Sequence, residues 1–339
     1  MRNKKVLITG GAGFIGCNTA ARLIKEGNEV FVLDNLSREG TKLNLKWLQG
    51  VGRFKFIRAD IRNFPLLKRL FKKNKFQAVI HLAAQVAVTT SIKDPLEDFE
   101  INAKGTLNLL EAVRQNNQNP VFIYSSTNKV YGSLDIFKIK ELKSRYSLIG
   151  SPDGIPEDFP LDFHSPYGCS KGSADQYVRD YGRIYGMKTV VLRQSCIYGP
   201  HQFGIEDQGW IAWFIKQALE GKTITIYGTG KQVRDLLFID DLVELYFNIM
   251  NNYKNYGVVY NVGGGPQNTL SIIEFLNILK KLNNGKLKVR YSTPRPGDQM
   301  IFFCDIRSIK KNYNWHPSVS VIKGTKDLYS WLKGGNYTQ

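Results

Sequence analysis

Cysteine is scarce in this chain of 339 residues. The four cysteines are Cys17, Cys169, Cys196 and Cys304. They form no CxxC pair and do not have the spacing typical of metal ligands, so we predict no metal site. A chain with so few and such scattered cysteines is typical of a reducing compartment.

Long apolar runs are also missing. No apolar stretch approaches the length that a membrane-spanning helix needs. The N-terminus passes from charged residues through one short apolar segment directly into glycines, which leaves no room for the core of a signal peptide. We therefore expect a cytoplasmic protein with no membrane partner.

Acidic residues are in the minority, with 29 Asp and Glu against 47 Lys and Arg, so the formal net charge is +18. Such an excess can indicate binding to a nucleic acid, an anionic membrane or an anionic substrate. However, the lysines are scattered from Lys4 to Lys333 and form no long basic block. We attribute most of the charge to a lysine-rich composition and expect no nucleic-acid partner.

A glycine-rich turn follows the first apolar segment. Lys5–Ile8 is typical of a buried strand, and Gly10–Gly16 comes directly after it in the spacing GxxGxxG. A segment of helical periodicity, Cys17–Glu26, and a second β run, Glu29–Leu33, come next. This spacing in a strand–turn–helix context is the fingerprint of a dinucleotide site, because the glycines let the backbone approach a pyrophosphate. The helix N-terminus also attracts the phosphates.

The second β run ends at Asp34, 18 positions after Gly16 (34 − 16). A carboxylate at this place can accept hydrogen bonds from the adenosine ribose, whereas it would repel a 2′-phosphate. The sequence therefore predicts NAD as the cofactor, in preference to NADP.

Short β runs and helical segments continue to alternate along the chain. This alternation predicts an α/β fold, namely a Rossmann doubly wound parallel sheet with a smaller C-terminal α/β substrate-binding domain. We assign 1–192 with 236–262 to the NAD-binding domain and 193–235 with 263–339 to the nucleotide-sugar-binding domain. The irregular stretch between Gly132 and His164, rich in Gly and Pro, is expected to be an active-site flap or insertion.

The stretch from His164 to Lys171 has the features of a catalytic helix. Pro166 suits the first turn of a helix, and Tyr167 and Lys171, four residues apart, share one face. An ammonium beside a phenol lowers the phenol pKa from about 10 toward neutral pH, which makes Tyr167 a candidate general base. A YxxxK pair alone also fits an ordinary amphipathic helix, so its context decides.

The motifs taken together resemble the extended short-chain dehydrogenase/reductase family, which comprises NAD-dependent nucleotide-sugar epimerases and dehydratases. The resemblance covers nearly the whole chain and rests on Gly10–Gly16, Asp60-Ile61, His81–Ala84, Asn102, Ser125–Thr127, Val130–Gly132 and Tyr167 with Lys171. It implies that the chain is an enzyme whose catalytic residues are Thr127, Tyr167 and Lys171. In this family the lysine binds the nicotinamide ribose and polarises the tyrosine.

The resemblance also implies two sets of binding residues. Those implied for NAD are Gly10, Gly13, Phe14, Ile15, Gly16, Asp34, Asn35, Asp60, Ile61, Leu82, Ala83, Ala84, Asn102, Tyr167 and Lys171. Those implied for the nucleotide sugar are Asn128, Lys129, His164, Gln208, Tyr227, Arg234 and Arg295. Within this second set, the two arginines match positions that bind the diphosphate, and the tyrosine matches one that stacks on the base. A purely structural role fits the histidine equally well. Cys196 stands where many members carry an asparagine whose amide contacts the diphosphate, so in this chain another residue must provide that contact.

Asn128 and Lys129 follow Thr127, where dehydratases of the family carry an Asp-Glu pair. Without this acid/base pair the elimination of water lacks its catalytic groups, so epimerisation is favoured. Longer matches resemble epimerases that invert C2 of a CDP-linked sugar by transient oxidation, and they comprise Thr127–Gly132, Asp162–Gly172, Arg193–Gly199 and Gln202–Trp210.

Other assignments stay open. One is a UDP-hexose 4-epimerase or another nucleotide-sugar oxidoreductase of the same fold, and another is a non-catalytic member that binds NAD or RNA. Members of the family usually dimerise through the helices near 96–115 and 166–185, and some are tetramers. The resemblance therefore implies a homodimer or homotetramer.

Overall fold

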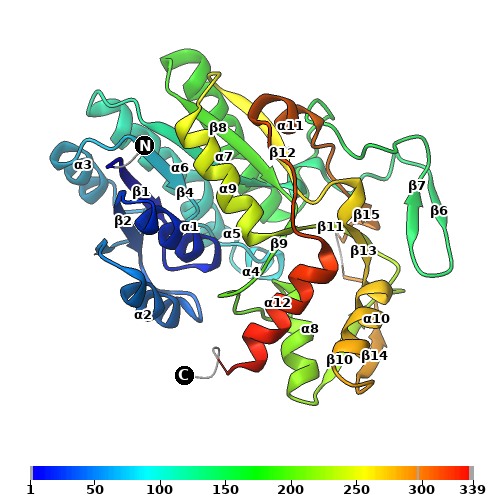
Figure 1. The fold of residues 1–339 in the computed structure, drawn as a ribbon. Coiled ribbons are helices and arrows are strands. Elements are labelled where there is room, and N and C mark those ends of the chain that lie inside the picture. Colours follow the sequence, from blue (N-terminus) through cyan, green and yellow to red (C-terminus); the bar gives the residue numbers. More distant parts are fainter. Residues whose placement is uncertain (1–2, 296–297, 336–339) are drawn as a thin grey trace.

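The computed structural model of the protein describes residues 3–295 and 298–335. Its central element is a sheet built from β1 (Lys5–Thr9), β2 (Glu29–Asp34), β3 (Lys55–Arg58), β4 (Ala78–His81), β5 (Val121–Thr127), β8 (Thr189–Gln194) and β12 (Val258–Val262). The seven strands are parallel and lie in the order β12-β8-β5-β4-β1-β2-β3 (Figure 1). Because the strand order reverses between β1 and β4, ligands are expected at the carboxyl ends of these strands. The predicted Rossmann fold is confirmed.

Helices cover both faces of the sheet. α1 (Phe14–Lys25), α2 (Thr41–Val51) and α9 (Ile239–Asn251) pack on one face, and α3 (Phe64–Lys73), α6 (Gly105–Gln115) and α7 (Ser165–Tyr185) pack on the other. Successive side chains of a strand face opposite sides of the sheet. Val6 and Ile8 therefore lie in the first hydrophobic core, and Leu7 lies in the second.

The helices that border the site differ in detail from the predicted ones. α7 has Pro166 in its first turn and ends before Gly186, as the sequence predicts. The helix expected over 96–115 is divided into α5 (Pro95–Phe99), a π-helical turn η1 (Glu100–Lys104) and α6, and it is preceded by α4 (Val88–Lys93). Such π-turns often occur at functional sites. This one places Asn102 in the protein interior.

A smaller α/β region lies beside the sheet, at the lower right of Figure 1. It contains α8 (Trp210–Leu219), α10 (Ile272–Leu282) and α12 (Val321–Lys333), with β10 (Thr223–Tyr227) paired to β14 (Lys288–Ser292). β11 (Val233–Phe238) pairs with β9 (Cys196–Tyr198), β13 (Thr269–Ser271) and β15 (Ile301–Phe302), and α11 (Arg307–Tyr313) follows β15. The exact boundaries of the two predicted domains stay a prediction, and positions 336–339 lie outside the described residues.

The irregular stretch between Gly132 and His164 follows a 3-10 turn, η2 (Asn128–Tyr131), and contains a hairpin of β6 (Ile139–Glu141) and β7 (Tyr146–Leu148). The hairpin projects from the body of the molecule at the right of Figure 1. Its turn is tied to α10, because Arg145, directly before β7, pairs with Glu274 at 2.7 Å.

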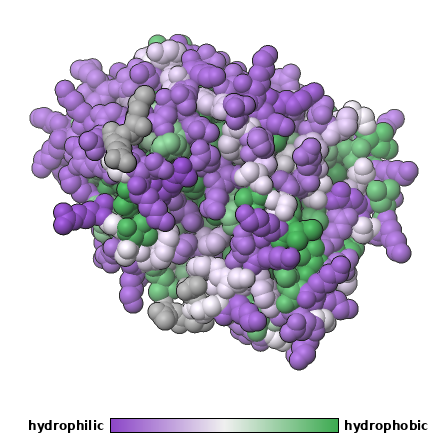
Figure 2. Space-filling model, in the orientation of Figure 1, coloured by the Kyte–Doolittle hydropathy of each residue, from purple (hydrophilic) through white to green (hydrophobic). Residues whose placement is uncertain are grey.

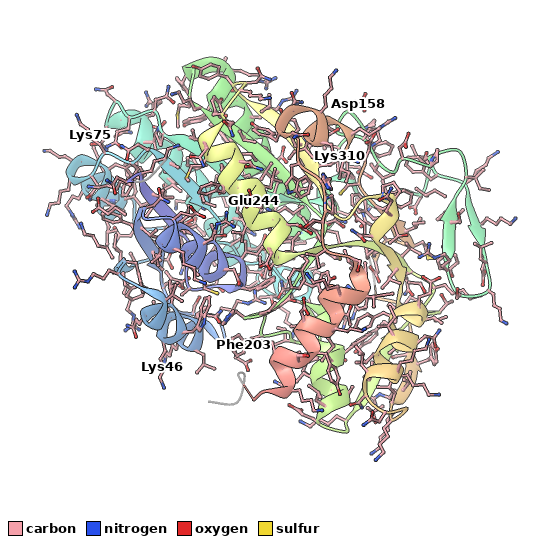
Figure 3. All side chains as sticks on the ribbon, in the orientation of Figure 1. Lys46, Lys75, Asp158, Phe203, Glu244 and Lys310 are labelled. Carbon is pink, nitrogen blue, oxygen red and sulfur yellow. The ribbon has the colours of Figure 1, made fainter. Side chains whose placement is uncertain are left out.

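The surface is mostly hydrophilic on the face seen in Figure 2, with smaller hydrophobic patches in its lower half and at its right edge. Between the front helices, Glu244 of α9, labelled in Figure 3, pairs with Arg22 of α1 at 3.2 Å. Within the described ranges, no helix is long and apolar enough to span a membrane. The same residues contain no cluster of three His, Cys, Asp or Glu side chains placed to hold a metal ion.

Candidate active site

One cavity opens at the carboxyl ends of β1, β2, β4 and β5, where the strand order reverses. All but one of the residues predicted to bind NAD line it, and these are Gly10, Gly13, Phe14, Ile15, Gly16, Asp34, Asn35, Asp60, Ile61, Leu82, Ala83, Ala84, Tyr167 and Lys171. Gly10 has φ +67°, and a Cβ there would lie 2.7 Å from the Ala83 amide nitrogen. Only glycine therefore allows the turn to lie so close to the β4 end.

Asp34 is held rigidly at the wall of this cavity. Its carboxylate accepts the Ala12 N–H at 3.0 Å and the Leu36 N–H at 2.8 Å, and the residue is 7% exposed. Burial raises the pKa of Asp34, and the backbone hydrogen bonds oppose that rise. Each carboxylate oxygen has a second lone pair, so the group can still accept a ribose hydroxyl. The glycine turn and this carboxylate fit an adenosine diphosphate.

Replacing Asp34 by alanine is expected to weaken NAD(H) binding and to relax the preference over NADP(H), because the ribose loses its acceptor and a 2′-phosphate loses its repelling charge. The dissociation constants of both cofactors, measured for the wild type and the variant, test this expectation. Equal affinities of the wild type for NAD(H) and NADP(H) would show that Asp34 does not select the ribose.

Asn102 is the predicted cofactor residue that lies outside the described lining of the cavity. Its amide donates to the Gln85 carbonyl at 3.0 Å and to the Ser170 hydroxyl at 3.1 Å, and its side-chain oxygen accepts the Gln85 N–H at 2.9 Å. This network ties the segment after β4 to α7. Asn102 thus supports the wall of the cavity, and its direct contact with NAD stays a prediction.

Thr127, Tyr167 and Lys171 lie together at the edge between β5 and α7, as predicted. All three are buried, and Tyr167 is 8% exposed. Burial raises the pKa of Tyr167 to about 12, although a hydrogen bond with Thr127 and the charge of Arg38 both lower it. The expectation that Lys171 lowers the pKa of this phenol toward neutral pH is therefore wrong, because burial outweighs the nearby charges.

A second reason is the direction of the lysine side chain. The Lys171 ammonium donates to the Ser125 carbonyl at 2.6 Å and lies 4.3 Å from the centre of the Tyr124 ring. Burial lowers the pKa of Lys171 to about 7, against the opposing charges of Asp175 and Asp98. The lysine therefore points to the end of β5, where Ser125 and Lys171 both line the cavity, and its contact with a nicotinamide ribose stays a prediction.

A second cavity adjoins the first, between the Rossmann sheet and the smaller region. Six of the seven residues predicted to bind the nucleotide sugar line it, and these are Asn128, Lys129, Gln208, Tyr227, Arg234 and Arg295. Cys196 and Trp210 also contribute to its wall. The seventh residue, His164, is about half exposed, pairs with Asp162 at 2.9 Å and does not belong to the described lining. Its geometry supports the structural role.

Both arginines already face carboxylates that the sequence interpretation did not single out. Arg234 pairs with Asp298 at 2.6 Å, and Arg295 pairs with Asp207 at 3.2 Å. The Arg295 guanidinium also lies 4.0 Å from the centre of the Tyr227 ring. The sequence did mark these two carboxylates, since Asp298 lies three positions after Arg295 and Asp207 belongs to an acidic pair in a basic chain.

The two cavities meet at the segment from 199 to 209. Gln208 lines both cavities, and its side-chain oxygen accepts a hydrogen bond from Arg38, which the sequence interpretation missed. Aromatic contacts hold this segment in place. The centre of the His201 ring lies 3.7 Å from that of Trp47 and 5.1 Å from that of Trp331. Phe203, labelled in Figure 3, packs against the same tryptophan, with 6.0 Å between the ring centres of Phe203 and Trp331. Gln208 therefore marks the boundary between the two cavities.

Comparison with known proteins agrees with this geometry. Residues 6–263 match the model of the NAD dependent epimerase/dehydratase family. The chain belongs to this family. This match confirms the predicted family. It also confirms NAD as the cofactor, because the family is NAD dependent and similar structures have been solved with NAD bound.

Individual relatives span almost the whole chain. The chain is 48% identical over 333 residues to a CDP-paratose 2-epimerase of Salmonella typhi, covering 96% of this chain and 98% of that relative. The solved UDP-glucuronic acid 4-epimerase of Bacillus cereus, in complex with UDP-glucuronic acid and NAD, is 30% identical with a TM-score of 0.84, over 97% of this chain and 99% of that one. The dTDP-glucose 4,6-dehydratase DesIV of Streptomyces venezuelae, with NAD and TYD bound, is 29% identical with a TM-score of 0.85, over 97% of each chain.

Proposed function

We propose that the chain is an NAD-dependent epimerase that inverts C2 of CDP-paratose to give CDP-tyvelose. The observation that carries the proposal is the 48% identity, over nearly the full length of both chains, to a CDP-paratose 2-epimerase. The two adjoining cavities support it, because the glycine turn and Asp34 line one of them and suit a dinucleotide, and the other holds two arginines for a diphosphate.

The residues after Thr127 support epimerisation over dehydration. Asn128 donates to the Gln299 side chain at 3.0 Å, and Lys129 carries an amine. Neither supplies the carboxyl pair that the loss of water would need for acid/base chemistry.

In the mechanism that follows, Tyr167 accepts the proton of the sugar C2 hydroxyl. Thr127 hydrogen-bonds the tyrosine and would also hydrogen-bond the sugar hydroxyl. NAD⁺, when bound, would supply the group that accepts the hydride from C2 and returns it to C2 on the opposite face. Lys171 binds the nicotinamide ribose. After the 2-keto sugar presents its opposite face, Tyr167 returns the proton to the oxygen.

We also propose that the protein acts as a homodimer or homotetramer in the cytoplasm. The helices expected at the interface carry exposed apolar side chains. These are Leu96 and Phe99 in α5 and Ile184 and Tyr185 at the end of α7. Burial of such surface between copies is favourable.

The test of the function is turnover of a panel of nucleotide sugars, with products resolved by chromatography and NMR. Conversion of CDP-paratose to its C2 epimer is the expected result. Inversion at C4 of a UDP-hexose without activity on CDP-paratose would instead favour the alternative 4-epimerase, for which the UDP-glucuronic acid 4-epimerase neighbour is the structural precedent.

Replacing Arg234 or Arg295 by alanine is expected to weaken nucleotide-sugar binding by about 10- to 100-fold, because each change removes a charge-assisted contact worth roughly 1.5–3 kcal/mol. Calorimetric titration with a CDP-sugar measures this effect. Arg307→Ala is the matched control, because its guanidinium is exposed and pairs with Asp305 outside the cavity. Unchanged affinity in both cavity variants would place the diphosphate elsewhere.

A further inference from the structure

Lys129 brings a third cation into the substrate cavity, beside Arg234 and Arg295. It lies in the η2 turn, and its backbone N–H donates to the Thr127 hydroxyl at 3.2 Å. The turn therefore fixes the main chain of Lys129 next to the catalytic hydroxyls. Lys129 and Arg234 line the same cavity.

The groups that face the Lys129 amine come from three other segments. They are Arg234 on β11, Cys196 on β9 and Asp298 before β15. Burial, followed by the like charge of Arg234, lowers the pKa of Lys129 to about 8, and the charge of Asp298 opposes this only in part. Burial raises the pKa of the Cys196 thiol, so that group stays neutral near pH 8.

The carboxylates of the cavity are already engaged. Asp298 pairs with Arg234, Asp207 pairs with Arg295, and Glu206 accepts the Tyr227 hydroxyl at 2.7 Å. A diphosphate entering this cavity adds two negative charges to a set that is close to neutral. An opposite charge nearby favours the protonated form of a buried amine. Binding of the anion therefore stabilises the ammonium.

We propose that Lys129 positions the diphosphate of the nucleotide sugar and takes up one proton from solvent as that group binds. The inference rests on the proposed function, because it needs a nucleotide-sugar ligand in this cavity. Both phosphoryl groups of such a ligand are esterified and remain ionised at neutral and alkaline pH. The new N–H bond therefore forms at Nζ of Lys129, with water or buffer as the proton donor. Lys129 also provides a donor at the wall that it shares with Cys196.

Calorimetric titration of CDP-glucose into the NAD-loaded Tyr167→Phe protein tests the proposal, because this background blocks turnover. The titration is run in two buffers of different ionisation enthalpy, which yields the number of protons taken up. If the pKa of Lys129 rises from about 8 to its ordinary value, uptake is about 0.7 proton at pH 8.5 and about 0.1 at pH 7. The affinity should fall as the pH rises above 8, because the ligand prefers the protonated form.

Two substitutions of Lys129 separate charge from packing. In the same background, Lys129→Met is expected to bind CDP-glucose more weakly and without proton uptake. Lys129→Arg, which is charged at every pH used, should retain affinity but also lose the uptake. Lys4→Met is the matched control, because burial also lowers the pKa of Lys4 and this residue lies outside the described lining of both site cavities. This control should keep the proton uptake at pH 8.5.

The outcomes distinguish the two proposals. Binding of CDP-glucose without proton uptake in the Tyr167→Phe protein, or proton uptake that persists in Lys129→Met, would overturn the proposed role of Lys129. Neither result would affect the proposed function. Failure of CDP-glucose to bind, with UDP-glucose binding instead, would overturn the proposed CDP-sugar function and this inference with it. Circular dichroism and retained NAD show that each variant is folded.

Discussion

Replacement of Tyr167 by phenylalanine is expected to lower kcat by about 10²- to 10⁴-fold, the usual contribution of a positioned acid/base group. The change removes only the hydroxyl that takes the proton from the sugar. The ring, which is 8% exposed, keeps its packing, so the fold and the NAD content should remain close to those of the wild type. Steady-state turnover of CDP-paratose, with the bound cofactor measured after denaturation, tests both parts.

A second tyrosine serves as the control for losing a buried hydroxyl. Tyr198 is 1% exposed, its hydroxyl lies 3.4 Å from the Val321 carbonyl, and it lies outside the described lining of both cavities. Tyr198→Phe should therefore leave kcat nearly unchanged. Near-normal turnover in Tyr167→Phe would mean that another group accepts the proton.

Local backbone patterns made the cofactor cavity predictable. The glycine turn, the strand ends and Asp34 are fixed by segments of a few residues each, and a doubly wound sheet brings strand ends to one edge. The positions of Gly10 and Ala83 illustrate this, because β1 and β4 are neighbours in the sheet and their following turns must touch. Most of the cofactor site thus follows from local sequence plus topology.

The ionisation of Tyr167 could not be predicted in the same way. Its spacing from Lys171 places both residues on one face of α7, but spacing does not fix the direction of a long side chain or its burial. Burial dominates the pKa of the phenol, and Lys171 donates to the Ser125 carbonyl. Both effects depend on how α7 packs on β5.

Long-range pairing limited the prediction of the substrate site. Arg234 meets Asp298, and Arg295 meets Asp207, across loops whose mutual placement no local pattern encodes. Asn102 lies outside the described lining of the cofactor cavity for another reason, because the π-turn directs its side chain to the Gln85 segment. Residue types were therefore predictable, whereas their partners depended on tertiary packing.

Turnover of CDP-paratose in D₂O is expected to give CDP-tyvelose with no deuterium at C2. The reason is that Tyr167 exchanges only an oxygen-bound proton, whereas the hydrogen on carbon leaves and returns as a hydride, which does not exchange with water. NMR of the product measures the label, and absorbance at the NADH wavelength should show no net reduction. C3, which lies next to the transient ketone, can exchange by enolisation, so C2 is the diagnostic position.

The matched experiment uses CDP-paratose carrying deuterium at C2, in ordinary water. Internal return predicts that the product keeps the label at C2, because none of the side chains in the proposed mechanism removes a proton from carbon. Tyr167→Phe should transfer the same label at a rate lower by the factor given above, which ties the carbon chemistry to the phenol. Solvent deuterium at C2, or loss of the label from C2, would instead require deprotonation at carbon. A 4-keto-6-deoxy product with deuterium at C6 would require elimination, for which Asn128 and Lys129 provide no carboxyl group.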